Sequence, residues 1–149
     1  MTSANMELVG LGELESRLQD YHDEVLDGVR EQVAIGALKI ETGAKRRIQR
    51  GPKTGRLYQK SNPSRAHRAS APGESPATDE GRLVASITHH FTQNGLNGDI
   101  GTNLDYGGFQ EHGTMDIEPR PWLFPTFEAL RPEIMQDIRD AIERAGQQR

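Results

Sequence analysis

The chain has 149 residues and a formal net charge of -4, from 18 basic and 22 acidic side chains. This length suits a single domain over residues 1–149, and Leu, Ile, Val and Phe make up only about one fifth of it, which predicts a small core that gains stability against other subunits. The absence of cysteine excludes disulfides, cysteine nucleophiles and cysteine zinc sites. No apolar run reaches the ~20 residues of a membrane span.

The N-terminal third carries a helical pattern. From Leu14 to about Gln49, apolar residues recur every three or four positions, which predicts one long amphipathic helix ended by Gly51-Pro52. Basic side chains fill its last turn, where they suit the negative end of the helix dipole. These cations are Lys45, Arg46, Arg47 and Arg50. Three glycines are expected to weaken the helix: Gly28, Gly36 and Gly43.

Residues 49–82 are rich in proline and glycine, and their only large apolar side chains are Leu57 and Tyr58. A loop of this length is uncommon inside a compact domain. We therefore predict that residues 51–82 form an extended arm, loop or hairpin that protrudes from the body and becomes ordered on assembly.

Basic charge is concentrated in the same part of the chain. Residues 42–73 contain nine Lys and Arg side chains and no Asp or Glu, which leaves nine cations against 22 anions elsewhere, a balance of -13. Such a segment favours contact with a nucleic-acid backbone or with an acidic protein surface. The alternative is a solvated basic loop without a binding role.

Two short strands are expected in the middle of the chain. Residues 83–92 alternate between apolar and polar side chains, which predicts a half-buried strand. Asn94-Gly95 and Asn97-Gly98 indicate a turn, and residues 99–102 can return as the antiparallel partner. Residues 106–112 can form one helical turn before Gly113, which we expect in the left-handed conformation.

The last part of the chain is predicted to be extended and then helical. Prolines bias residues 117–123 toward extended geometry, and residues 125–145 have the period of an amphipathic helix that ends at Gly146. Pro132 should kink this helix or mark its first turn. Tyr106 and residues 122–124 have the character of buried anchors. The expected fold class is α+β: a long N-terminal helix, an antiparallel hairpin sheet with a protruding basic arm, and a C-terminal helix.

The residue types that carry catalysis do not form a convincing set. His89 and His90 are adjacent on a predicted strand and point to opposite faces, so they cannot chelate one ion together. The segment after residue 51 lacks the spacing of a phosphate-binding loop. Glu111 and Asp116 flank Gly113, but nothing supplies a nucleophile. We therefore expect no enzymatic activity, no metal and no cofactor.

Three segments in order resemble one protein family. They are GPKTGRLY at 51–58, continuing to RASAPGESPATDEGRLVASI at 68–87, then YGGFQEHGT at 106–114, and RPWLFP at 120–125 before an amphipathic helix. Together they resemble the tailed-bacteriophage tail-component family of head–tail morphogenesis clusters, over roughly residues 7–145. The motif residues expected to have structural roles are Gly55, Pro72, Gly73, Gly81, Leu83, Ile87, Tyr106, Glu111, Gly113, Thr114, Arg120, Pro121, Trp122 and Pro125.

The sequence departs from the family pattern at three motif positions. Gly107 stands where the family usually has alanine, and both His112 and Trp122 stand where it has phenylalanine. We expect these changes to be conservative for packing, except His112, which makes its position more polar.

The resemblance implies a structural protein of the virion neck, assembled in the host cytoplasm. Such proteins form rings, here a hexamer or dodecamer, that complete the tail tube and join it to the head connector. The resemblance leaves open whether this is a tail completion, tail terminator or head–tail joining protein. It implies neighbouring head-connector and tail-tube proteins and passage of genomic DNA through the lumen, with no membrane contact.

The residues expected at a subunit interface or in the arm are Lys45, Arg46, Arg47, Arg50, Arg56, Leu57, Tyr58, Arg65 and Arg68. A nucleic-acid-binding protein that uses the basic segment 42–73 is the alternative function. Against it, the segment has almost no aromatic side chain on which bases could stack. A small hydrolase or nuclease is a third possibility, but the sequence contains no motif for one.

Overall fold

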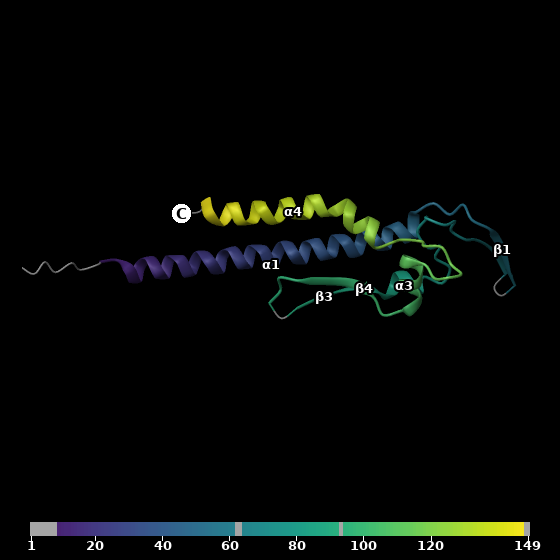
Figure 1. The fold of residues 1–149 in the computed structure, drawn as a ribbon, viewed down its shortest axis with the longest axis horizontal. Coiled ribbons are helices and arrows are strands. Elements are labelled where there is room, and N and C mark those ends of the chain that lie inside the picture. The colour runs from purple at the N-terminus through teal and green to yellow at the C-terminus, as the bar shows by residue number, and fades with distance from the viewer. Residues whose placement is uncertain (1–8, 62–63, 93, 148–149) are drawn as a thin grey trace, which may run out of the picture.

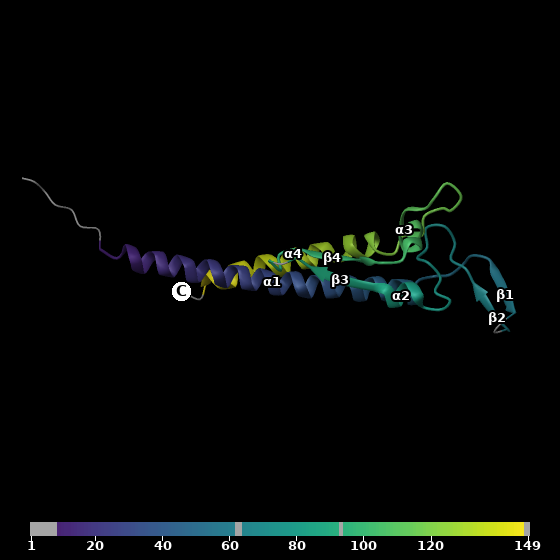
Figure 2. The ribbon, with the colours of Figure 1, turned by 90° about the horizontal axis from the view of Figure 1, so that it is seen from below.

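A computed structural model describes residues 9–61, 64–92 and 94–147. In chain order, its elements are α1 (Leu11–Arg50), β1 (Leu57–Ser61), β2 (Ser64–Arg68), α2 (Arg82–Ser86), β3 (Ile87–Phe91), β4 (Gly98–Thr102), α3 (Asp105–His112) and α4 (Phe124–Gln147). Helix α1 runs along most of the long axis of the molecule (Figures 1 and 2). This arrangement confirms the predicted α+β class.

Helix α1 is one uninterrupted helix of 40 residues, which corresponds to a length of about 60 Å. Its amphipathic period therefore predicted it correctly, although it begins three residues before Leu14. Gly51 ends it as expected: the Gly51 N–H donates to the Arg47 carbonyl at 2.9 Å, and the backbone then becomes extended.

Helix α4 lies antiparallel along α1, with its C-terminal end toward the start of α1 (Figure 1). It begins one residue before the predicted start and continues through Gly146 to Gln147, so the expected stop at Gly146 is wrong. Pro132 lies inside this helix, whose first turns are inclined to the rest in Figure 1. The removal of one helical hydrogen bond at Pro132 accounts for such a bend.

Small residues let the two long helices approach closely. A methyl group added at Gly36 would lie 2.9 Å from Cγ2 of Ile134, and one added at Gly43 would lie 2.7 Å from Cγ2 of Thr126. These glycines are contact positions, where the backbone of α1 meets side chains of α4. Helix propensity, on which the expectation of weak points rests, does not describe this second role.

Charged side chains also join α1 and α4. The Lys39 ammonium group donates to a carboxylate oxygen of Glu133 at 2.7 Å and to one of Asp137 at 2.8 Å. The hydrogen bonds that Lys39 donates to Asp137 and then to Glu133 raise the pKa of Lys39 above its ordinary value. Because both carboxylates belong to α4, this pairing favours one register of the helices over others.

The buried core is small and lies along the C-terminal half of α1. Its central cluster takes buried residues from α1, from α2 and β3, and from the segment just before α4: Ala44, Ile48, Leu83, Val84, Ile87 and Trp122. Leu123 and Ile100 pack against this group. With Ala37, Ile40, Ala141 and Ala145, ten apolar residues are buried in the described part of the chain. This small core agrees with the low content of large apolar residues in the sequence.

The predicted strand over residues 83–92 is half wrong. Residues 82–86 form the short helix α2, and only Ile87–Phe91 is a strand. Leu83 and Ile87 are four residues apart, a spacing that strands and helices share, and the neighbouring Val84 is buried as well. The return strand was predicted correctly: β3 and β4 pair antiparallel, with Ile87 opposite Thr102.

The arm contains an antiparallel hairpin, as expected for one of its predicted forms. Strands β1 and β2 pair with Leu57 opposite Arg68 and Ser61 opposite Ser64. The hairpin projects from the end of the molecule at which α1 terminates (Figure 1). It pairs separately from β3 and β4, so the described strands form two small sheets.

A carboxylate joins the second hairpin to α1 and should make stability depend on pH. Glu41 on α1 accepts hydrogen bonds from Lys45 and pairs with His89 on β3. The bond from Lys45, and then that from His89, lowers the pKa of Glu41 below its ordinary value of 4.5. Because the folded-state pKa is depressed, this stabilisation is fully present above pH 4.5 and is lost as the pH falls toward the lowered value. We expect Glu41→Gln to be less stable than the wild type at pH 7.

The measurement is the urea midpoint of both proteins between pH 7 and pH 3. The difference between wild type and Glu41→Gln should shrink as the pH falls below 4.5. As a control, Glu118→Gln removes an exposed carboxylate and should leave the pH profile unchanged. A difference that stays constant over the whole range would contradict the assignment to Glu41.

Candidate functional site

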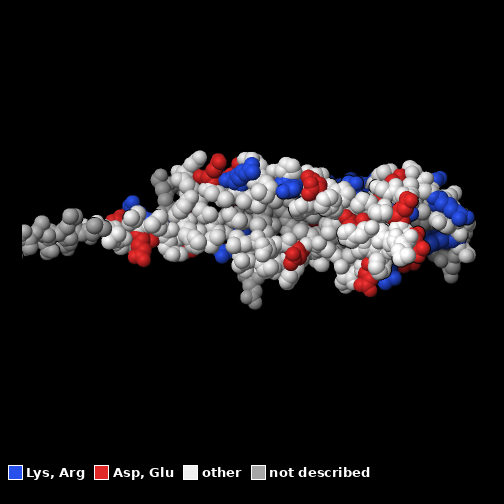
Figure 3. Space-filling model, viewed as in Figure 1, with Lys and Arg blue, Asp and Glu red and all other residues white. Residues whose placement is uncertain are grey.

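The basic surface predicted from the sequence lies at the arm end of the molecule. Arg46, Arg47 and Arg50 on the last turns of α1 are exposed, and they form no ion pair with any described residue. The Arg56 guanidinium lies 5.4 Å from the ring centre of Tyr58, and Arg68 donates to the Gly55 carbonyl at 3.2 Å. Figure 3 shows blue side chains gathered at this end.

Part of the basic charge is neutralised inside the arm itself. Asp79 pairs with both Lys60 and Arg65 on the two strands of the hairpin, and the Nδ1 atom of His67 lies 3.8 Å from its carboxylate. Lys45 is paired with Glu41. The sequence count of nine cations therefore overstates the charge that is free to meet a partner.

A second carboxylate holds the two ends of the arm together. Glu74 accepts hydrogen bonds from the Thr54 hydroxyl at 2.6 Å, the Thr54 N–H at 2.9 Å and the Ala71 N–H at 2.8 Å. These bonds, first of all that from the Thr54 hydroxyl, lower the pKa of Glu74. The hairpin is thus attached to the body by specific polar contacts at its base.

The same attachment explains several glycines of the motif. A methyl group on Gly55 would lie 2.7 Å from the Ser70 carbonyl oxygen, so the two sides of the arm base can meet only without a side chain. Gly73 and Gly81 have positive φ values of 80° and 76°, which favour glycine. The Gly73 N–H donates to the Pro119 carbonyl at 2.9 Å. Pro72, beside it, is exposed.

Glu111 closes a second junction, at the N-terminus of α4. Its carboxylate accepts the backbone N–H groups of Trp122, Leu123 and Phe124 at 2.7, 2.9 and 2.8 Å. These donors have no partner within the helix, so a carboxylate from α3 satisfies them and meets the positive end of the helix dipole. Pro125 follows in the first turn, where a missing N–H costs nothing.

Trp122 anchors this junction in the core. Its side chain is 2% exposed, and its Nε1–H donates to the Gly107 carbonyl at 3.1 Å. A methyl group at Gly107 would lie only 2.4 Å from Cγ2 of Thr102. The expectation that glycine and alanine are equivalent for packing at residue 107 is therefore wrong for this fold.

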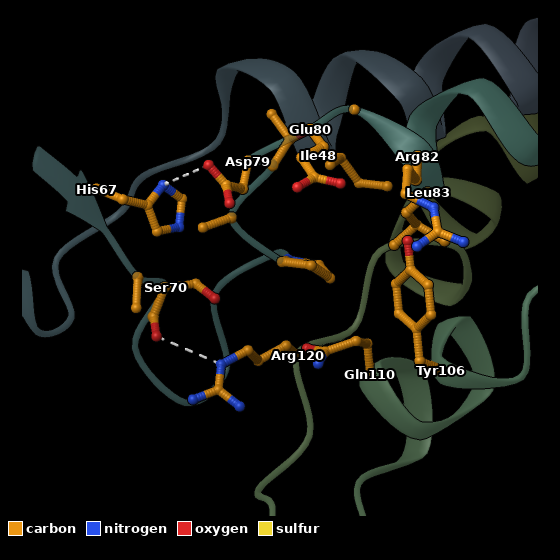
Figure 4. Close-up of a pocket in the computed structure, with 15 residues that line it drawn as sticks. Ile48, His67, Ser70, Asp79, Glu80, Arg82, Leu83, Tyr106, Gln110 and Arg120 are labelled. Carbon is orange, nitrogen blue, oxygen red and sulfur yellow. Dashed lines mark hydrogen bonds and ion pairs between the residues drawn. The ribbon is translucent and has the colours of Figure 1, made fainter. Parts of the chain in front are cut away.

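Two of the expected buried anchors are not buried. Tyr106 is 38% exposed and Phe124 is 63% exposed. The Tyr106 ring points toward Arg82 and Leu83, while the Arg120 side chain extends away from it toward Ser70 (Figure 4). Glu111 contacts the segment after residue 120, whereas Tyr106 faces a pocket.

This pocket lies between the arm, α2 and α3 and has a volume of about 410 Å³. Its lining includes His67, Asp79, Gln110 and Arg120 (Figure 4). The Arg120 Nε–H donates to the Ser70 carbonyl at 3.3 Å, and the Arg120 N–H donates to the Gln110 carbonyl at 2.6 Å. Arg120 therefore joins the arm to α3, which gives this motif residue a structural role.

Gly113 ends α3 at a position that only glycine suits. Its φ is 76° and its ψ is 179°, so the predicted positive φ is confirmed, but the ψ value is not that of the left-handed helix. After it, the Thr114 hydroxyl accepts the N–H groups of Asp116 and Ile117 at 3.2 and 3.1 Å. The turn leads into Pro121 and the junction at Glu111.

We expect Gly113→Val to lower the free energy of unfolding by about 1–3 kcal/mol through backbone strain. The added Cβ would also lie 2.7 Å from the Ile117 carbonyl oxygen. Thermal melting followed by circular dichroism measures the change. Gly108→Ala is the control, because a methyl group there would meet nothing within 4 Å; equal melting of wild type and Gly113→Val would contradict the prediction.

No local sequence pattern marks the carboxylates that organise the arm and its attachment. Asp79 and Glu74 stand out in the sequence only as two acidic residues outside the basic segment, because their partners are far along the chain or on the backbone. Within the described residues, no group of three or more His, Asp or Glu side chains is placed to hold a metal ion. None of the described helices is both long and apolar enough to cross a membrane.

Comparison of the chain with protein-family models, with curated proteins and with solved structures found no match.

Proposed function

We propose that this chain is a structural subunit of the neck of a tailed bacteriophage virion. In this role, copies of the chain form a ring that completes the tail tube and joins it to the head connector. The order of the three sequence motifs suggests the family. The observation that carries the proposal is an extended subunit with a small core, which leaves large apolar side chains exposed at several places.

The exposed apolar side chains are unusual in size and grouping. Leu11, Leu14 and Leu18 on α1 are each more than half exposed, as are Phe109 and Phe124 near the junction at Glu111. A monomeric soluble protein seldom leaves such groups uncovered, and they commonly mark interaction surfaces. Contacts with further copies and with neighbouring neck proteins would bury them.

The motif residues support an assembly role for the arm. Gly55, Gly73, Glu74 and Arg120 all serve to attach the hairpin to the body, as described above. An arm held by specific contacts at its base presents its outer surface in a defined direction. A subunit of a closed ring needs two different complementary surfaces, and the arm supplies one of them.

Nucleic-acid binding is the second candidate, and one observation favours it. Arg46, Arg47 and Arg50 are exposed side by side and form no ion pair within the described part of the chain. However, the Tyr58 ring is covered on one face by Arg56, so the arm offers little surface for stacking bases.

The direct test is native mass spectrometry and negative-stain imaging of the purified chain, together with a head–tail joining assay. A ring of six or twelve copies, and restoration of infectious particles when the protein is added to separated heads and tails, are the results expected. A monomer or dimer that retards DNA in a gel would instead support nucleic-acid binding.

Reversal of Arg46, Arg47 and Arg50 to glutamate should weaken ring assembly, and wild-type assembly should itself weaken as salt rises. Exposed charges are screened over a Debye length of about 8 Å at physiological ionic strength. If these arginines face DNA instead, ring assembly should be nearly independent of salt while DNA contact is lost. We favour an acidic protein neighbour, because a basic lining of the ring lumen would hinder the movement of DNA through it.

The assays are ring formation and head–tail joining over a salt series. The matched control reverses three cations of α4, Arg131, Arg139 and Arg144, which are exposed and distant from the arm along the chain. Intact rings and full joining by the arm variant at every salt concentration would show that its charges are only solvated.

A further inference from the structure

The first ten residues of α1 form an exposed helical stub, which we define as residues 11–20. Every residue in it is exposed. Leu11, Leu14 and Leu18 are spaced by three and four positions, so they share one face of the helix. They are 56%, 54% and 59% exposed, and they line a shallow hollow with Glu15 and Gln19.

The stub continues the face of α1 that α4 covers further along. Going back from Gly43 and Gly36, which contact α4, the same face passes through Gly28 and Tyr21 in steps of seven or eight residues. Another step of seven reaches Leu14. A Cβ at Gly146 would lie 3.7 Å from the Tyr21 hydroxyl, so the described part of α4 ends beside Tyr21 and leaves the leucines uncovered.

The charge at the N-terminal end of α1 favours one kind of partner surface over others. Residues 11–31 contain seven acidic side chains and two basic ones, and acidic side chains are prominent at this end in Figure 3. Two stubs brought together would therefore repel each other. A surface that combines apolar groups with positive charge fits the stub better.

The outer face of the β1–β2 hairpin has this combination. Side chains alternate between the faces of a strand, so Tyr58, Lys60, Arg65 and His67 share the face that meets Asp79, and the opposite face carries the others. We call this opposite face the free face, and its members are Leu57, Gln59, Ser61, Ser64, Ala66 and Arg68. All six are exposed, and residues 56–68 contain no acidic side chain.

We infer that the stub of one copy docks on the free face of the hairpin of the next copy. Leu14 and Leu18 then cover Leu57 and Ala66, and Glu15, which lines the same hollow as the leucines, meets Arg68. The stub and the hairpin lie at opposite ends of the molecule (Figure 1), so the contact is head-to-tail and closes a ring only if the rotation between copies allows it. This contact rests on the proposed function and names the surfaces that build the ring.

The absence of cysteine makes cross-linking the sharpest test. The full-length double variant Leu14→Cys/Ala66→Cys, treated with a short bis-maleimide cross-linker, should give a ladder of covalent oligomers. Leu14→Cys/Tyr58→Cys is the matched control, because residue 58 lies on the opposite face of the same strand, and it should cross-link at least about fivefold less. Cross-linking of the single variant Leu14→Cys would show that two stubs pair. More cross-linking of Leu14→Cys/Met135→Cys than of Leu14→Cys/Ala66→Cys would place the stub on α4. Either result overturns the inference.

Charge exchange provides a second test that does not alter the leucines. Glu15→Lys and Arg68→Glu should each weaken self-association roughly tenfold, which is the effect of about 1.4 kcal/mol. An equimolar mixture of the two should recover it, since each reversed stub then meets a reversed hairpin. Glu143→Lys/Arg139→Glu on α4 is the control. Failure of the mixture to recover association would overturn the inference.

Native mass spectrometry of the wild type separates the two possible failures. A wild-type ring without the stub–hairpin cross-link overturns this contact and leaves the proposed neck function standing. A wild type that is monomeric over the whole concentration range removes the ring and the contact together.

Discussion

Replacing Gly36 and Gly43 together by leucine should lower the free energy of unfolding by about 2–6 kcal/mol. Overpacking at a tight contact typically costs about 1–3 kcal/mol at each site, and seven residues of helix separate the two sites by about 10 Å, so the costs should add. At Gly43 even a methyl group would lie 2.7 Å from Thr126. Thr126 cannot yield easily, because its hydroxyl donates to the Trp122 carbonyl at 2.8 Å.

Urea unfolding followed by the fluorescence of the single tryptophan measures this effect at a concentration where the protein is monomeric. Gly12→Leu is the control in the same helix: a side chain there would meet nothing within 4 Å, and leucine is the better helix former. Its stability should be unchanged or slightly higher. Equal urea midpoints for the double variant and the wild type would show that α1 and α4 do not pack through these glycines.

Glu111→Ala should lower the free energy of unfolding by about 2–4 kcal/mol. Loss of a helix cap costs up to about 2 kcal/mol, and loss of a negative charge at a partly buried helix N-terminus costs up to about 2 kcal/mol more. Glu111 provides both, because one carboxylate accepts three consecutive N–H groups. Glu111→Gln keeps one oxygen acceptor without the charge, so its loss should be intermediate.

The measurement is again urea unfolding, with Trp122 as the reporter beside the altered cap. Glu128→Ala, an exposed position further along α4, is the control and should change stability by less than about 0.5 kcal/mol. The order wild type, Glu111→Gln, Glu111→Ala is expected for the urea midpoints. Equal stability of Glu111→Ala and Glu128→Ala would contradict the capping role.

Periodicity predicted the two long helices well, because each buries one continuous face over many turns. It could not predict how they meet. Gly36 and Gly43 have low helix propensity, so the sequence marked them as weak points, whereas the neighbouring side chains of Ile134 and Thr126 give them their role. Close approach depends on the partner helix, which no local pattern describes.

Local patterns also failed where a short element had both faces buried. Leu83, Val84 and Ile87 are all buried, so an alternating strand and a single helical turn fit the same residues about equally. In the structure the Ala85 N–H donates to the Gly81 carbonyl at 2.9 Å, which closes the helical turn. Turn chemistry was more informative elsewhere, since the hairpin of β3 and β4 was predicted from its Asn-Gly pairs.

The sequence indicates where the basic surface lies, but it overstates how much of the positive charge on that surface is unpaired. The basic run from Lys45 to Arg68 does lie at one end of the molecule, but Asp79 neutralises part of it from eleven residues further along the chain. The family motif marks Glu111 as structural but does not indicate what it contacts. Its role as a cap became apparent only from the three N–H groups that surround it.

The uneven placement of the core along α1 has a consequence for local opening of the helix. Amide groups near Ala44 and Ile48, which are fully buried, can exchange their hydrogens with solvent only when the core itself opens. Amides of the exposed residues 11–20 need only the fraying of a helix end, which costs little free energy. The rate of hydrogen exchange should therefore fall from the start of α1 to its end. A partner bound to Leu11, Leu14 and Leu18 would slow exchange in the first turns alone and so reduce this difference.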